Sequence, residues 1–206
     1  IKRQISISLA FAPVKYKGVR INVMDAPGNF DFSGEAVSAI RAAECAVLVG
    51  AAKDGLSVGM ERSWKLLGKK PRMIFVNRTD EDNSDYNATF EALRARFGNK
   101  IAPLVVPIWD EGKKVTGIID VLNKRAYEMQ NGKRVEIEIP EGKDAVIEEF
   151  NNALKESVAE TSEEFMDKFF GGEDFTYAEM AQGLRQGVRE LSVFPVLCGS
   201  AVADMG

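Results

Sequence analysis

Three short polar motifs each follow an apolar, strand-like run in this chain, and their order is the feature that most constrains the fold. They are Asp25-Ala26-Pro27-Gly28, Asn77-Arg78-Thr79-Asp80 and Gly199-Ser200-Ala201. In an open α/β sheet, ligands bind beyond the carboxyl ends of the strands. We therefore expect the three motifs to lie at one such edge, with Asp25 and Asp80 on the same rim.

The segments around these motifs alternate between strand and helix patterns. The sequence predicts a β-hairpin from residues 5–11 and 19–23, helices over 32–43, 60–67 and 86–97, and strands over 45–50, 72–76 and 193–198. The run over 45–50 is almost continuously apolar, which is typical of a strand buried on both faces. Met60, Trp64 and Leu67 share one helix face and are expected in the core. This alternation predicts an α/β fold with a parallel sheet.

The stretch between Asp80 and Gly199 is longer than one helix and one strand require, which indicates an inserted α+β domain. Its first half predicts strands around residues 115–121, 127–129 and 135–139, with a type I′ turn at Asn131-Gly132. Its second half has one long helical stripe over 147–169, which ends at Gly171-Gly172. Thr176 and Glu179 then predict a capping box at the start of another helix.

Composition excludes several classes of protein. The chain has no histidine, which removes Ser-His-Asp and Cys-His catalysis, and its two cysteines are too few for zinc. Cys45 and Cys198 both lie in apolar runs, so we expect buried thiols in a cytoplasmic protein. A net charge of −4 argues against direct DNA reading. The longest apolar run, 45–52, is too short to span a membrane.

The motif at Asp25 has two interpretations. The carboxylate of Asp25 could hold Mg²⁺ through water while the Gly28 amide faces a terminal phosphate. Alternatively, the motif is an Asp-Pro-Gly turn that leaves a strand, and taken alone this simpler interpretation is favoured.

The motifs at Asn77 and Gly199 predict recognition of guanine. The Asp80 carboxylate can accept hydrogen bonds from the ring NH and the exocyclic amine of guanine, a pattern that adenine does not offer. Asn77 would tie the neighbouring loops together, and Ser200-Ala201 would add a backbone amide for the guanine carbonyl. Each motif alone could be an ordinary turn, but the three in this order are typical of a GTPase.

The phosphate loop of such a GTPase is missing, since Gly-x-x-x-x-Gly-Lys-Ser/Thr occurs nowhere in the chain. The expected fold is therefore a P-loop-NTPase-like sheet without its first strand and phosphate loop. We expect this sequence to be a piece of a longer protein, and alone to bind nucleotide weakly or not at all. A protein that never had a phosphate loop is the open alternative.

Beyond the motifs, essentially the whole chain resembles bacterial elongation factor G and its close paralogues. Residues 3–7, Arg-Gln-Ile-Ser-Ile, are similar to the end of switch I, and residues 25–32 to switch II. The resemblance implies a ribosome-dependent GTPase of translocation that uses GTP/GDP and Mg²⁺. It also implies a GTPase core formed by residues 1–103 and 192–206, with an inserted G′-like subdomain over 104–191. In that family the inserted subdomain contacts the stalk protein of the large ribosomal subunit.

Three positions depart from the family pattern. Ser6 stands where a threonine ligates Mg²⁺ and keeps the oxygen, while Arg78 replaces a lysine that packs on the guanine ring. Asn29 occupies the position of the catalytic histidine that orients the attacking water, and its amide has a shorter reach. These departures leave a second function open, namely a degenerate paralogue that binds ribosomes with slow or no hydrolysis.

Overall fold

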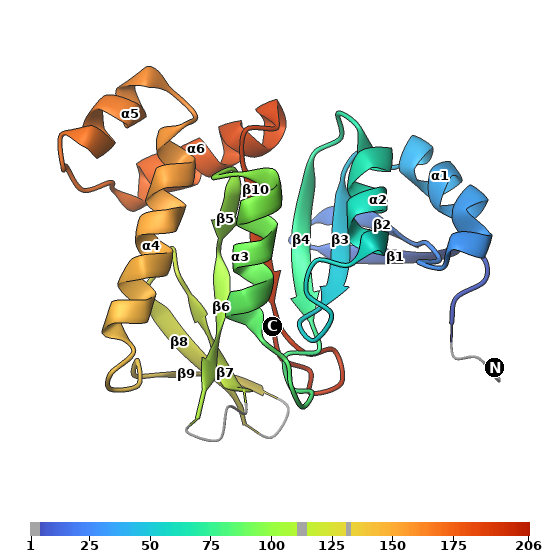
Figure 1. Ribbon diagram of the computed structural model, residues 1–206, viewed down its shortest axis with the longest axis horizontal. Coiled ribbons are helices and arrows are strands. Elements are labelled where there is room, and N and C mark those ends of the chain that lie inside the picture. The colour runs from blue at the N-terminus through green and yellow to red at the C-terminus, as the bar shows by residue number, and fades with distance from the viewer. Residues whose placement is uncertain (1–4, 111–114, 131–132) are drawn as a thin grey trace. The chain divides into compact units, whose positions relative to one another are not determined.

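The computed structural model describes residues 5–110, 115–130 and 133–206 (Figure 1). Contacts within the chain divide it into two compact units. Unit 1 comprises Ile1–Ala46 and Val58–Lys70, and unit 2 comprises Val47–Ser57 and Pro71–Gly206. Among the residues described, no helix is both long and apolar enough to cross a membrane.

Unit 1 contains the predicted β-hairpin, in which β1 (Ala10–Tyr16) pairs antiparallel with β2 (Val19–Asp25). The turn residues Lys17 and Gly18 have φ angles of 46° and 80°, as a type I′ turn requires. The first strand begins at Ala10 rather than at Ile5, so the predicted start is wrong. Ala10 pairs with Asp25, the last residue of β2, and β2 therefore offers no partner to residues 5–9.

Unit 1 also contains a short 3-10 helix, η1 (Phe30–Phe32), and the helices α1 (Ser33–Ala42) and α2 (Val58–Leu67). The predicted helices are confirmed, and α1 and α2 are in contact. Met60 and Leu67 are buried as their spacing predicts, and Trp64 is half-buried.

The main sheet of unit 2 has the strand order β3-β4-β10-β5. Its strands are β3 (Ala46–Ala51), β4 (Arg72–Asn77), β10 (Phe194–Cys198) and β5 (Ile101–Pro103). Strand β10 lies parallel to both β4 and β5, which confirms the predicted parallel sheet. The two strands of the hairpin form a separate sheet.

Strand β3 is less buried than the sequence predicts. Leu48 is buried, but Val47 and Val49 are 56% and 58% exposed, so the strand is not buried on both faces. The physical reason is its position, because β3 is the edge strand of the four-stranded sheet and the face that carries Val47 and Val49 is uncovered. An apolar run indicates that a strand is suited to burial, but it does not show whether another helix or strand packs on each of its faces.

Helix α3 (Tyr86–Phe97) follows β4 and has the predicted limits. The Asp85 side chain caps its start by accepting a hydrogen bond from the Ala88 amide at 2.9 Å. Gly98 ends the helix with a φ of 82°, a conformation that favours glycine.

The second sheet of unit 2 is antiparallel, with the order β6-β7-β8-β9. Its strands are β6 (Val105–Trp109), β7 (Val115–Asp120), β8 (Arg125–Gln130) and β9 (Lys133–Ile137). The predicted pairing of β8 with β9 is confirmed, while the turn predicted at Asn131-Gly132 lies outside the described residues.

Strands β5 and β6 are not predicted from the sequence. Each contains a proline, Pro103 in β5 and Pro107 in β6, which weakens a strand pattern. Both strands are edges of their sheets, where a missing backbone N–H costs no ladder hydrogen bond.

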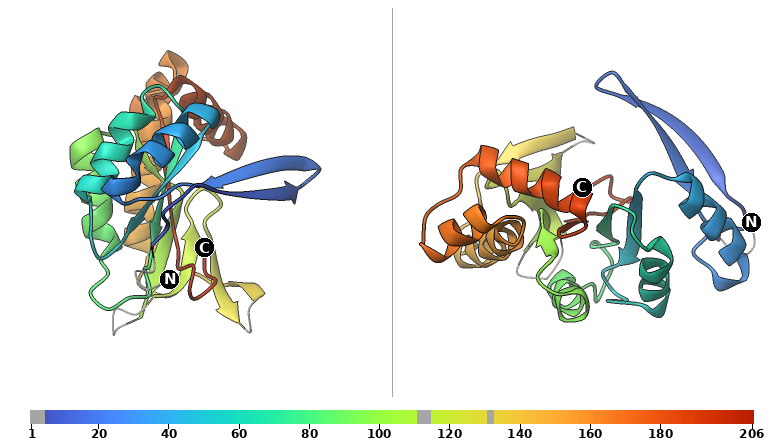
Figure 2. Two further views of the ribbon diagram at one scale, coloured as in Figure 1. Left: turned by 90° about the vertical axis from the view of Figure 1, so that its right-hand side faces the viewer. Right: turned by 90° about the horizontal axis from the view of Figure 1, so that it is seen from above.

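Three helices, α4 (Asp144–Ala159), α5 (Glu163–Phe170) and α6 (Tyr177–Glu190), follow the second sheet in the chain and are drawn in orange to red in Figure 2. Helix α4 contacts α5, α6 and β5, and α6 also contacts β10. The prediction of one continuous helix over 147–169 is wrong, because α4 ends at Ala159 and a separate helix, α5, begins at Glu163. Ser162 begins α5 by accepting a hydrogen bond from the Phe165 amide at 3.2 Å. The capping box of α6 is confirmed, since the Glu179 amide donates to Thr176 Oγ1 and the Thr176 amide to the Glu179 carboxylate.

Aromatic rings join α3 to α4. The ring of Phe150 on α4 meets Tyr86 and Phe90 of α3 edge-on, with centroids 6.0 Å and 5.4 Å apart. The elements from β6 to α6 lie within the predicted insertion, 104–191, and the exact domain boundaries stay a prediction.

Candidate functional site

The register of β4 and β10 sets two of the motifs side by side. Val76 of β4 pairs with Cys198 of β10, so the chain leaves both strands at the same level. The next residues are Asn77 and Gly199, and the Gly199 amide donates to the carbonyl of Val76 at 3.1 Å. The two loops therefore begin together at the carboxyl edge of the parallel sheet, where the sequence predicts a ligand site.

The side chain of Asn77 connects these loops. Its Oδ1 accepts a hydrogen bond from the Ala201 amide at 3.0 Å. The carbonyl of Asn77 accepts one from the Ala52 amide, just after β3, at 2.9 Å. Asn77 thus ties together the loops that follow β3, β4 and β10.

Thr79 is a structural member of the site that the sequence does not single out. It is 2% exposed, and its amide and Oγ1 both donate to the Gly199 carbonyl, at 3.3 Å and 3.1 Å. Ser84 Oγ in turn donates to the Thr79 carbonyl at 2.8 Å. The sequence gives little indication of this role for Thr79, because the carbonyl to which its hydroxyl donates lies 120 residues later in the chain.

Gly199 has no room for a side chain. A Cβ atom there would lie 2.2 Å from the Met205 carbonyl oxygen and 3.0 Å from the Phe75 ring. Residues 200 and 205 close the loop through two hydrogen bonds, from the Ser200 amide at 2.7 Å and from the Met205 amide at 2.9 Å.

The backbone amides of Ser200 and Ala201, predicted to face a guanine carbonyl, both have partners within the protein. Ser200 donates to Met205 and Ala201 donates to Asn77. A base carbonyl that reached the Ala201 amide would share it with Asn77 Oδ1 or replace that oxygen.

Asp80 is half-buried, and within the described ranges no hydrogen bond or ion pair occupies its carboxylate. The neighbouring Arg78 has a φ of 59°, and its guanidinium lies 3.4 Å from Glu81. This arrangement leaves both carboxylate oxygens of Asp80 available to accept two parallel hydrogen bonds.

In unit 1, the two predicted Mg²⁺ ligands lie next to each other. Ser6 Oγ donates to Asp25 Oδ2 at 3.4 Å, and both side chains are exposed. A hydroxyl and a carboxylate are hard oxygen donors that suit Mg²⁺, which binds few protein groups and keeps several waters. No cluster of three or more acids, cysteines or histidines that could hold a metal occurs in residues 5–110, 115–130 and 133–206.

The turn after Asp25 leads into η1. Pro27 is buried, Gly28 and Asn29 are exposed, and an added Cβ at Gly28 would meet nothing within 4 Å. Asn29 caps η1, since its Oδ1 accepts from the Asp31 amide and its carbonyl from the Phe32 amide, both at 3.1 Å. The Asn29 side chain therefore offers its NH₂ group, while its oxygen is engaged within the turn.

Asp25 belongs to unit 1 and Asp80 to unit 2, so their expected meeting on one rim stays a prediction.

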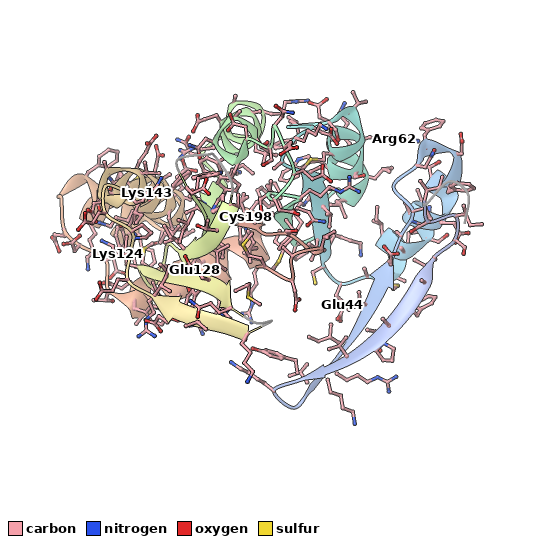
Figure 3. The ribbon with its side chains drawn as sticks, turned by 90° about the horizontal axis from the view of Figure 1, so that it is seen from below. Glu44, Arg62, Lys124, Glu128, Lys143 and Cys198 are labelled. Carbon is pink, nitrogen blue, oxygen red and sulfur yellow. The ribbon has the colours of Figure 1, made fainter. Side chains whose placement is uncertain are left out.

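The two cysteines differ in exposure. Cys45 is exposed, which corrects the expectation of burial, because the residue precedes the edge strand β3. Cys198 lies inside unit 2 (Figure 3), where burial raises the pKa of its thiol well above the ordinary value.

A parallel α/β sheet with the loops Asn77–Asp80 after β4 and Gly199–Ala201 after β10 is the arrangement expected of a GTPase domain. The sequence profile of the elongation factor Tu GTP binding domain matches residues 1–206, and the chain belongs to this family. Members of the family bind guanine nucleotides and are GTPases. The resemblance inferred from the motifs is therefore confirmed at the level of the family.

Two relatives agree with this assignment. An elongation factor G-like protein of Thermotoga maritima is 32% identical over 203 residues, which cover 98% of this chain and 29% of that protein. A crystal structure of a Thermus thermophilus protein has a TM-score of 0.90 and 32% identity, and the match covers 100% of this chain and 31% of that one. The chain thus spans less than a third of the length of each relative.

Proposed function

We propose that this chain contributes the guanine-binding part of a translational GTPase of the elongation factor G type, which acts in ribosomal translocation in the cytoplasm. The observation that carries the proposal is the hydrogen bond from Ala201 to Asn77, which joins the loops of β4 and β10. Asp80 lies in the first of these loops, and its carboxylate has no hydrogen-bond or ion-pair partner among the described residues. In this proposal Asp80 accepts from the guanine NH and NH₂ groups, and Arg78 leaves Glu81 to stack on the ring.

The variant Asp80→Asn tests base recognition. The change replaces an acceptor oxygen by an NH₂ donor, which opposes the guanine donors, so GDP affinity should fall by about 10- to 100-fold. The measurement is calorimetric titration of the complete gene product with GDP and ADP. Asp82→Asn, an exposed acid in the same loop, is the matched control and should bind as the parent does. Equal GDP affinity in Asp80→Asn and the parent would contradict the proposal.

We propose that groups outside these 206 residues bind the phosphates, because the sequence contains no phosphate-loop motif. We propose that a phosphate loop and the strand before it complete the sheet at the edge of β3, where Val47 and Val49 are exposed. In that arrangement Ser6 and Asp25 hold Mg²⁺, which would neutralise charge on the phosphates, and the Gly28 amide donates to the terminal phosphate.

The 206-residue chain alone should then bind GTP far more weakly than the complete gene product. Calorimetry on both proteins measures the difference. Equal tight binding would show that the phosphates are held by residues within this chain.

Asn29 is the proposed water-positioning residue. Its Oδ1 already accepts from Asp31, so only the amide NH₂ could contact the attacking water, and hydrolysis should be slow. The variant Asn29→His should raise the ribosome-stimulated GTPase rate of the complete gene product. Equal and fast rates in both proteins would remove this role, and no turnover in either would favour the degenerate ribosome-binding paralogue.

The inserted region is the proposed contact for the ribosomal stalk protein of the large subunit. A groove of about 390 Å³ lies between α3 and α4, and its lining includes the buried rings of Phe90 and Phe150 and the side chains of Glu91 and Glu149. Reversing both charges with Glu91→Lys and Glu149→Lys should weaken binding to the isolated stalk protein. Unchanged binding would count against this surface.

A further inference from the structure

A contact between α2 and η1 lies beside Asn29 and is independent of the guanine loops. The guanidinium carbon of Arg62, on α2, lies 3.8 Å from the centroid of the Phe30 ring (Figure 3 labels Arg62). Both residues belong to unit 1. The ring is 69% exposed, so burial in the core does not fix its position.

Among the described residues, the contact with Phe30 is the one hydrogen-bond, ion-pair or ring interaction of the Arg62 guanidinium. No carboxylate among them pairs with this half-buried guanidinium. A guanidinium stacked on an aromatic face is attracted by the negative charge of the ring, and the strength of the contact depends on the planar fit. Arg62 and Phe30 therefore restrain each other.

Phe30 is the first residue of η1, and Asn29 caps the same turn. The Asn29 side chain and carbonyl accept the amides of Asp31 and Phe32, so movement of the Phe30 ring would shift the backbone that presents Asn29. A one-turn 3-10 helix has few hydrogen bonds of its own and needs outside contacts to stay ordered.

We propose that Arg62 is a positioning residue for the turn Gly28–Phe32, acting through its stack on Phe30. The contact lets α2 hold Asn29 in one orientation before a nucleotide or a ribosome is present. Its catalytic consequence rests on the proposed function, whereas its effect on the turn does not.

The test compares three variants of the complete gene product. Arg62→Gln removes the cation, Phe30→Leu removes the ring, and Arg62→Lys keeps the charge but not the planar stack. Lys65→Gln removes an exposed cation from the same helix and is the matched control.

The first measurement is hydrogen exchange of the Asp31 and Phe32 amides without nucleotide. Exchange should be about 2- to 5-fold faster in Arg62→Gln and in Phe30→Leu, the range given by an exposed cation–π contact. The double variant should exchange no faster than either single variant, Arg62→Lys should be intermediate, and Lys65→Gln should match the parent. Additive effects, or unchanged exchange in Arg62→Gln, would overturn the proposal.

The second measurement is ribosome-stimulated GTP hydrolysis. In Arg62→Gln, kcat should fall about 2- to 5-fold with KM for GTP unchanged, because the guanine loops are not altered. A rise in KM at constant kcat would overturn the positioning role. If the parent hydrolyses no GTP while the exchange results hold, the proposed function fails and the positioning of the turn stands.

Discussion

Asn77 Oδ1 accepts a hydrogen bond from the backbone amide of Ala201, which lies 124 residues later in the chain, at 3.0 Å. The second sheet and the helices α3 to α6 occupy most of the sequence between them. The Asn77 side chain, together with the Thr79 hydroxyl, thus joins the two loops of the candidate guanine site across this long stretch of chain.

The variant Asn77→Ala should loosen this junction. Loss of the acceptor should lower the free energy of unfolding by about 0.5–1.5 kcal/mol, the usual net value of one hydrogen bond, and reduce GDP affinity. Urea unfolding and calorimetry of the complete gene product measure both effects. Asn87→Ala, an exposed position on α3, is the control and should leave both quantities unchanged. Parent-like GDP affinity in Asn77→Ala would show that the junction does not shape the site.

Gly199→Ala should distort the loop after β10. The new Cβ would lie 2.2 Å from the Met205 carbonyl, so the backbone must move, at a cost of about 1–3 kcal/mol in unfolding free energy. Gly34→Ala on α1 is the matched control, because a Cβ there meets nothing within 4 Å and alanine favours a helix. Thermal unfolding compares the two, and equal midpoints would contradict the steric argument.

Glu156→Gln should weaken the attachment of α4 to α3. Glu156 pairs with Arg94, whose side chain is only 17% exposed, and also accepts from Asn99 at 3.0 Å. We expect a loss of about 1 kcal/mol in unfolding free energy, after allowance for solvent screening. Glu148→Gln on the same helix removes a pair with Lys124 whose side chains are more than half exposed, and should cost less than about 0.5 kcal/mol. The prediction fails if urea unfolding gives the two variants equal losses.

The link between α5 and α6 should depend on pH. The hydrogen bond from Lys168, followed by those from Thr176, lowers the pKa of Glu179 from 4.5 to about 2. A carboxylate with a lowered pKa in the folded state stabilises the fold above pH 4.5, and this contribution disappears as the pH falls toward 2. The thermal midpoint of Glu179→Gln should therefore lie below that of the parent at about pH 6, and the difference should shrink between pH 4.5 and 2. A constant difference over that range would show that the ionised form is not what stabilises the link.

Local patterns were sufficient to predict most helices and the strands that precede the candidate guanine loops. The helix over 86–97 has a capping Asp85 at its start and Gly98 at its end, and both signals act within a few residues. The β1–β2 hairpin and the capping box at Thr176 are equally local, so they could be read directly from the chain.

Other features depended on partners that the sequence does not identify. Helix α4 ends before Ser162, although the helical spacing of apolar residues continues into α5. The reason is that Ser162, followed by two acidic residues, caps the start of a new helix. The proline-containing strands β5 and β6 form because each lies at a sheet edge. Thr79 joins the site only through the carbonyl of Gly199.

The sequence by itself determined the family and predicted the residue types of the candidate site, because the motifs at Asp25 and Asn77–Asp80 each follow an apolar run in a recognisable order. Only the tertiary structure decided that β4 and β10 lie in parallel register, that Asn77 holds Ala201, and that Val47 and Val49 are uncovered on β3. The physical reason is range. Caps, turns and periodicity act over a few residues, whereas register and burial depend on contacts between segments far apart in the chain.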